Sequence, residues 1–169
     1  MNSYQQLWWE QAKSDHAIFS LLRGSGVAEC HILHYLQMCT EKLAKAYFWR
    51  EEKPPARTHV GFVQFMRFLG AVQKPDRERV ADLFSFTRFD DFQTRIKSVL
   101  ELAYDLERIT PDLANDGPNP EYPWPHDLPK LAPVNYTFPV WKELSSGRGR
   151  ELMRLIQTAV VRFPEYADT

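Results

Sequence analysis

The uneven distribution of proline constrains the fold of this chain more than any other feature of its sequence. Eight of the twelve prolines lie between Pro111 and Pro139. Proline lacks a backbone N–H and breaks the interior of a helix, so this segment cannot form a sustained helix. Its aromatic and aliphatic side chains favour an ordered loop or polyproline II segment over disorder. Residues 111–140 are called the strap below.

The chain on both sides of the strap follows helical periodicity. Between residues 28 and 50, for example, apolar residues recur at steps of three and four, as on the buried face of a helix. We therefore predict an all-α fold: an up-and-down helical bundle of four to five helices in residues 1–110, the strap packed on it, and a closing helix of the same domain in residues 141–169. The predicted helices span residues 3–23, 28–50, 59–72, 76–109 (with a break near 87–90) and 146–162. In the third of them we expect partial burial of Val60, Val63, Met66, Phe68 and Leu69.

Composition excludes several classes of protein. With 44% hydrophobic and 25% charged residues, the chain is neither disordered nor collagen-like. Its net charge of −1 gives no global basic field to attract nucleic acid. Cys30 and Cys39 fit no zinc-binding spacing, and no apolar stretch is long enough to span a membrane. Since no secretory signal is evident either, we expect a cytoplasmic protein that needs no metal, no cofactor and no membrane.

Four charged residues are candidates for a polar site. Asp15 lies on the apolar face of the first predicted helix, and Lys42 flanks the apolar face of the second, so Lys42 is its expected partner. Glu41 and Lys45 stand four residues apart on the opposite strip of the second helix, where such pairs stabilise a helix without any other role. Two interpretations stay open: these residues line a functional cleft, or their ion pairs are purely structural.

Arg57 and His59 form the pair most typical of catalysis. Histidine titrates near neutral pH and transfers protons, while arginine binds phosphate through two hydrogen bonds. Arg57 precedes the third predicted helix, Thr58 is its predicted N-cap, and His59 is its first residue. The N-terminus of a helix favours anions. The alternative is that His59 packs or caps at this turn and has no catalytic role.

Two further features could contact a ligand. Residues 118–125 of the strap read PNPEYPWP, and their aromatic side chains either bind a partner or a base or clamp the strap onto the bundle. Basic residues in or before the last predicted helix either contact phosphates or form a solvated face. They are Lys142, Arg148, Arg150, Arg154 and Arg162.

The second predicted helix carries a recognisable motif. Residues 37–46 read QMCTEKLAKA, which resembles the central motif of the HEPN family: a glutamine, a small residue two positions on, then Glu-Lys and Lys-Ala. Residues 12–17 are similar to the family's first helix, and the run RTH at 57–59 resembles its Thr-His entry into the third helix. The resemblance covers roughly residues 7–110. It implies an up-and-down helical bundle that is often dimeric.

The resemblance also narrows the function. HEPN proteins include ribonucleases, toxins of toxin–antitoxin pairs, phage-defence effectors and non-catalytic modules that bind nucleotides or RNA. The ribonucleases carry an arginine followed, after four to six residues, by a histidine, and no histidine of this chain has an arginine at that spacing. The sequence therefore favours a non-catalytic binding or regulatory component. Its expected partners are a second copy of the chain, RNA, and a nucleotidyltransferase-type or other protein.

Two alternatives remain open, so the sequence does not decide whether the chain is an enzyme. One is a divergent ribonuclease in which Arg57 and His59 form the site together with their copies across a dimer. The other is a scaffold whose strap binds another protein.

Overall fold

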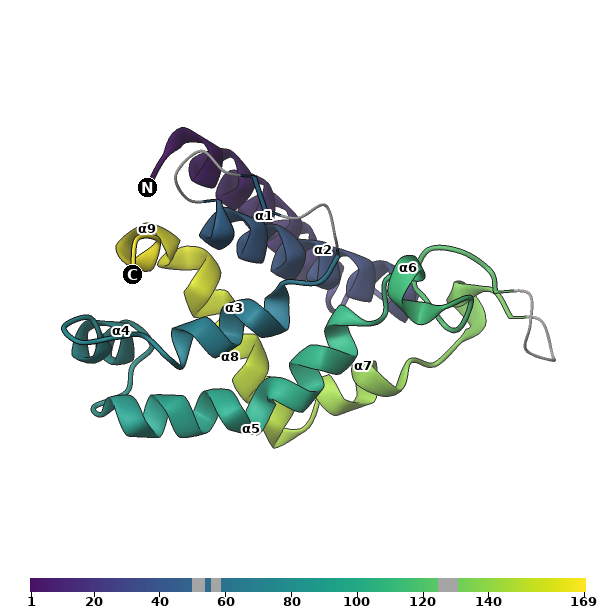
Figure 1. Cartoon of the computed structure of the whole chain (residues 1–169). Helices are drawn as coiled ribbons and strands as arrows, with labels where there is room; N and C mark the ends of the chain where they lie inside the picture. Colours follow the sequence, from purple (N-terminus) through teal and green to yellow (C-terminus); the bar gives the residue numbers. More distant parts are fainter. Residues whose placement is uncertain (50–53, 56–58, 125–130) are drawn as a thin grey trace.

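The computed structural model describes residues 1–49, 54–55, 59–124 and 131–169. In these ranges the fold is all-α, as predicted, and the one strand-like pairing is an isolated antiparallel bridge between Trp124 and Leu131. None of the helices described is long and apolar enough to cross a membrane. In chain order the elements (Figure 1) are α1 (Ser3–Leu22), α2 (Glu29–Phe48), α3 (Phe62–Leu69), α4 (Arg77–Leu83), α5 (Phe89–Glu107), α6 (Pro111–Ala114), the 3-10 helix η1 (Pro133–Asn135), α7 (Pro139–Leu144), α8 (Gly147–Val161) and α9 (Phe163–Tyr166).

Helices α1 and α2 form the hairpin that opens the bundle (Figure 1). A capping box starts α1: the Asn2 side chain accepts a hydrogen bond from the backbone N–H of Gln5, and the Gln5 side chain accepts one from the backbone N–H of Asn2. Gly24 and Gly26 in the turn adopt φ values of 101° and 81°, which glycine tolerates without steric cost. The Gly-Ser-Gly sequence therefore ends the first helix where periodicity predicts.

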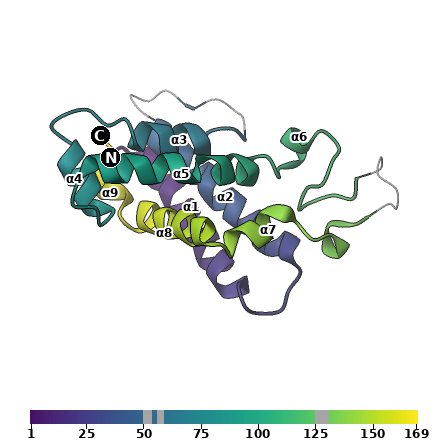
Figure 2. The same cartoon turned by 90° about the horizontal axis from the view of Figure 1, so that it is seen from below.

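The core lies between the hairpin and helices α5 and α8 (Figures 1 and 2). The break predicted near residues 87–90 lies between α4 and α5, so one long helical pattern is two helices. The predicted apolar faces of α2, α5 and α8 are buried. Their residues are Ile32, Leu36, Cys39, Leu43 and Ala46 of α2, Phe92, Ile96, Val99, Ala103 and Leu106 of α5, and Leu152, Leu155, Ile156, Ala159 and Val160 of α8.

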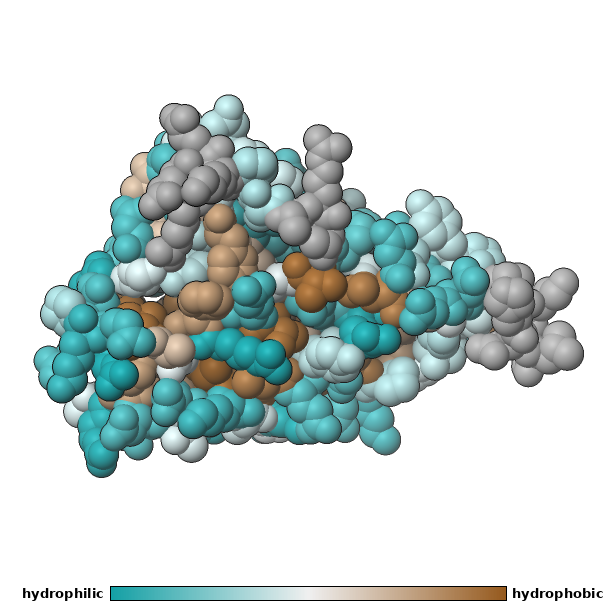
Figure 3. Space-filling view, viewed as in Figure 1, coloured by the Kyte–Doolittle hydropathy of each residue, from teal (hydrophilic) through white to brown (hydrophobic). Residues whose placement is uncertain are grey.

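Helix α3 is shorter than the sequence predicts, because it begins three residues later and ends three residues earlier. Gly61 is its N-cap residue, and the predicted N-cap, Thr58, lies outside the described residues. Phe68 is 49% exposed, since only one face of this short helix packs on the bundle, and Val60, which precedes the helix, is 53% exposed. Figure 3 shows apolar side chains gathered on the face of the molecule over α3. The buried residues of α3 are Phe62, Val63, Phe65, Met66 and Leu69.

Prolines of the strap start short helices rather than excluding helix altogether. Helices α6, η1 and α7 begin at Pro111, Pro133 and Pro139, because the first helical position needs no N–H and the ring fixes a suitable φ. Trp124 is buried with its ring edge-on to Tyr136, whose ring in turn packs on Phe138. The strap thus has its own aromatic packing, and it extends beyond one end of the bundle (Figure 1).

The closing helix α8 starts directly against α7, which the periodicity does not predict. Gly149 permits this approach, because a Cβ there would lie 2.2 Å from the backbone oxygen of Glu143. After α8 the chain returns to the N-terminus (Figures 1 and 2), where the Met1 amino group lies 2.7 Å from an Asp168 carboxylate oxygen. The two ends of the described chain are therefore tied together.

Candidate functional site

The buried carboxylate of Glu41 on α2 is the centre of the candidate site. Its Oε1 accepts a hydrogen bond from Lys45 Nζ at 2.5 Å, and its Oε2 accepts one from Gln37 Nε2 at 3.1 Å. Both partners stand one helical turn away on the same face, so the helix itself supplies this geometry. The Glu41 residue is only 5% exposed. The sequence placed it on the strip opposite the apolar face of its helix, and the structure shows that this strip is covered.

The segment that covers Glu41 brings in His59, which is remote from it in sequence. The Nδ1 atom of His59 lies 2.8 Å from Glu41 Oε2. Burial by itself raises the pKa of Glu41, but hydrogen bonds from Lys45, His59 and Gln37 more than offset this and hold that pKa below its ordinary value. Glu41 is therefore an anion at neutral pH, held by three donors.

His59 faces a second carboxylate through its other nitrogen. Its Nε2 lies 3.3 Å from Asp112 Oδ2, at the start of α6, and its side chain is 40% exposed. A cationic ring donates to both carboxylates, whereas a neutral ring donates to one of them. The imidazole therefore bridges α2 of the bundle and the first helix of the strap.

Glu107 at the end of α5 fixes the chain on the other side of His59. Its buried Oε2 accepts hydrogen bonds from the backbone N–H groups of Gly61, at 2.9 Å, and Val63, at 3.1 Å. These are free N–H groups at the start of α3, and a carboxylate satisfies both of them. Sequence reasoning missed Glu107, because a glutamate at a helix end is typical of an exposed residue and nothing local indicates its partners.

A small cavity opens beside this cluster. It has a volume of about 190 Å³, and its polar lining comprises the Glu41, Lys45 and Gln64 side chains. The Lys45 ammonium also lies over the Trp8 ring, 5.1 Å from its centroid. Such a cavity suits a small apolar group with one polar end. Its other lining residues are Ala44, Phe48, Pro55, Val60 and Gly61.

Asp15 and Lys42 form a separate pair and do not join this cluster. Lys42 Nζ lies 2.5 Å from Asp15 Oδ2, and both side chains are largely buried. This confirms the predicted ion pair between α1 and α2. Arg57 lies outside the described residues, so its position relative to His59 is not described. Among the residues that are described, no three His, Cys, Asp or Glu side chains are grouped so that they could hold a metal ion.

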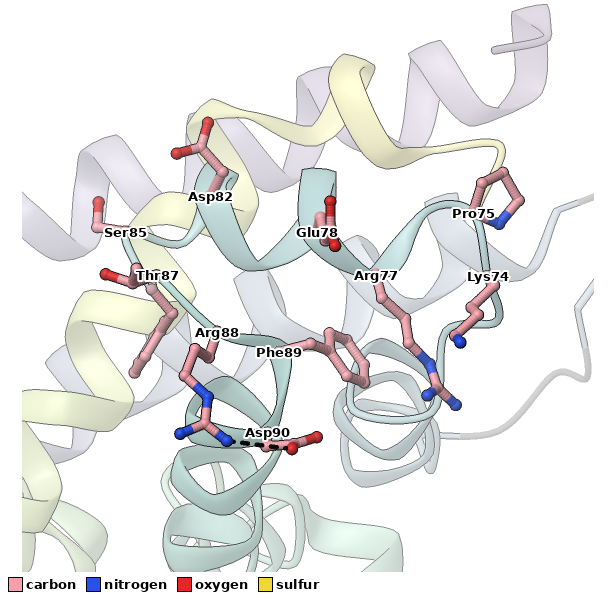
Figure 4. Close-up of a pocket in the computed structure, with 11 residues that line it drawn as sticks. Lys74, Pro75, Arg77, Glu78, Asp82, Ser85, Thr87, Arg88, Phe89 and Asp90 are labelled. Atoms are coloured by element: carbon pink, nitrogen blue, oxygen red, sulfur yellow. Dashed lines mark ion pairs between the residues drawn. The ribbon is translucent and has the colours of Figure 1, made fainter.

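A larger hollow of about 1140 Å³ lies between α4 and the start of α5 (Figure 4). Its charged side chains carry both signs. Arg88 pairs with Asp90 at 3.5 Å, and Arg77 donates to the Val72 backbone oxygen at 3.0 Å. Phe89 lies under the Arg77 guanidinium. Because basic and acidic side chains both line the hollow and offset one another in charge, its lining shows no concentration of one charge.

Comparison of the chain with protein-family models, curated proteins and solved structures finds no match. The resemblance to the HEPN family therefore stays a prediction from residues 37–46 and 57–59.

Proposed function

We propose that this chain is an HEPN-like helical protein that acts without catalysis, as a binding or regulatory component linked to RNA or nucleotides in a toxin–antitoxin or defence system. In this proposal it works in the cytoplasm as a homodimer, with a nucleotidyltransferase-type or other protein as a further partner. The motif at residues 37–46 and the all-α bundle support the proposal.

The observation that carries the non-catalytic assignment is that no histidine follows an arginine at the spacing of the ribonucleases, and the environment of His59 supports it. A general acid or base needs a ring nitrogen within hydrogen-bond reach of the substrate. In this site Glu41 lies at Nδ1 and Asp112 lies near Nε2. His59 thus has a structural task, which is to hold the segment before α3 against α2 and the strap.

An RNA cleavage assay tests this assignment. The purified chain is incubated with labelled single-stranded RNA, in parallel with His59→Ala and with His34→Ala as a matched histidine control on α2. We expect no cleavage by any of the three proteins. Cleavage by the wild type and the control that His59→Ala abolishes would contradict the proposal.

Exposure at the same histidine favours a second candidate, the divergent ribonuclease that uses Arg57 and His59 across a dimer. The Asp112 side chain is 77% exposed, so it can leave His59 Nε2 at little cost and free that nitrogen for a substrate. This candidate requires the dimer as well as the histidine. It predicts that cleavage falls on dilution below the dimer dissociation constant, as measured by sedimentation.

The strap supports the third candidate, a scaffold for a protein partner. Tyr122 is 61% exposed, while the neighbouring Trp124 is buried in the aromatic packing of the strap. The strap therefore exposes one aromatic side chain next to another that is packed. Deletion of residues 112–140 would then abolish partner binding and leave the bundle folded, and loss of the bundle's helical signal would contradict this candidate.

A further inference from the structure

A groove between α1 and α8 gathers basic and neutral polar side chains and lies outside the site described above. The two helices lie side by side (Figure 2), joined by a hydrogen bond from Trp9 Nε1 to the Val160 backbone oxygen at 2.7 Å. The groove has a volume of about 410 Å³, and the side chains of Phe19 and Met153 form its apolar part. Its polar lining comprises His16, Ser20, Arg23, Arg150, Arg154 and Gln157.

Two of the three arginines that line the groove have no carboxylate partner among the described residues. Arg23 stands at the end of α1 and Arg150 in the first turn of α8, and neither forms an ion pair with any described residue. Arg150 donates only to the backbone oxygen of Ser145, at 2.9 Å. By contrast, Arg148 and Arg154, also on α8, pair with glutamates. Two cations from different helices therefore converge on one groove without an anion.

His16 adds a neutral hydrogen-bonding group to the same groove. The residue is 9% exposed, and its ring has no hydrogen-bond partner among the described residues. Burial lowers the pKa of His16, so the ring is neutral at pH 7 and keeps one N–H donor and one acceptor. His16 lines the groove, and its ring nitrogens are not among the described buried polar atoms that lack a partner, so they open onto the groove and are available to a polar ligand.

We propose that this groove binds the phosphate group of a nucleotide unit, with Arg23 and Arg150 pairing with phosphate oxygens and His16 donating to the same group. Its volume falls within the range of about 300–1,000 Å³ that is usual for ligand sites. Guanidinium groups suit phosphate because they donate two parallel hydrogen bonds. The inference rests on the proposed link to RNA or nucleotides and assigns that link a place in the fold.

Fluorescence anisotropy with a labelled single-stranded RNA, and competition by ATP, tests the assignment on the full chain. The groove variant is Arg23→Ala/Arg150→Ala. The control variant, Arg67→Ala/Arg88→Ala, removes the same charge from other exposed positions. We expect the groove variant to bind at least about tenfold more weakly. The slope of log affinity against log salt should also become shallower by about 0.7, since the groove holds one phosphate group and each phosphate contact on a single strand contributes about 0.7. The control variant should stay within about twofold of the wild type, because long-range charge is screened by salt.

The outcomes separate the sources of phosphate and the two proposals. If ATP displaces the labelled RNA, the groove binds free nucleotides as well as RNA. If RNA binds and ATP does not displace it, the groove binds only the phosphates of an RNA strand. Equal loss in both double variants, or no binding of either ligand by the wild type, overturns the groove assignment. Cleavage that depends on His59 overturns the non-catalytic function instead, whatever the groove variants show. Circular dichroism of each variant verifies that the bundle remains folded.

Discussion

Glu107 offers the sharpest test of how the candidate site is built. Its Oε2 is the acceptor for the backbone N–H groups of Gly61 and Val63, and the residue is 4% exposed. In Glu107→Ala both donors lose their acceptor inside the protein. A buried donor left without a partner costs about 1–3 kcal/mol, so two such donors give about 2–6 kcal/mol of lost stability.

Glu107→Gln separates the hydrogen bonds from the charge. A glutamine keeps one acceptor oxygen for the two N–H groups but removes the negative charge at the start of α3, an interaction with the helix dipole that contributes about 0.3–1 kcal/mol. We therefore expect a loss of about 1 kcal/mol for this variant. Glu101→Ala is the matched control on α5, because its side chain is 77% exposed in its pairing with Arg148. Exposed pairs contribute about 1 kcal/mol or less.

The assay is urea unfolding followed by far-UV circular dichroism, with the four proteins compared at one pH. The expected order of stability is wild type, then Glu101→Ala and Glu107→Gln together, then Glu107→Ala. NMR signals of the His59 ring should also shift in Glu107→Ala, while those of His31, on the first turn of α2, should not. A Glu107→Ala protein within about 0.5 kcal/mol of the wild type would refute the reasoning, since the two N–H groups would then have other partners.

Two further outcomes are expected. Lys42→Met should destabilise the fold by about 2–4 kcal/mol in urea unfolding, because it leaves the Asp15 carboxylate buried without a cation. Adding Asp15→Asn to this variant should recover at least half of that loss. Equal stability of the single and double variants would contradict this pairing. The folded-state pKa of Glu41 lies below its unfolded value, so its contribution to stability is complete above about pH 4.5 and is lost as pH falls through the folded pKa. The difference in unfolding free energy between wild type and Glu41→Gln should therefore shrink as the pH falls below about 4.5. A difference that stays constant would show that the ionised Glu41 carboxylate does not stabilise the fold.

The parts of the fold that the sequence predicts well are those with a local signal. Helices α2, α5 and α8 have buried faces that repeat every three or four residues, and their predicted ends fall within a few residues of the observed ones. The Asp15–Lys42 pair was also predictable, because a charge on or beside an apolar face requires a partner. In each case a residue and its near neighbours carry all the information that the prediction uses.

The parts that sequence reasoning missed depend on contacts between distant segments. Helix α3 begins at Phe62 because Glu107, on α5, satisfies its first N–H groups. Glu41 is buried because the segment before α3 lies over it, although its own helix assigns it to the polar strip. A pattern within one helix shows which face is apolar, but it does not show which polar face another segment will cover.

These distant contacts have a common arrangement that bears on function. The chain from His59 to Val63 is held between two buried carboxylates, Glu41 on α2 and Glu107 on α5. The second carboxylate at His59 is Asp112, which stands one residue after the first proline of the strap. The histidine thus connects the helix that resembles the HEPN motif to the proline-rich segment that lies outside that resemblance. Of the two carboxylates at His59, Glu41 is buried and Asp112 is exposed, so the contact with the strap is the one that solvent reaches.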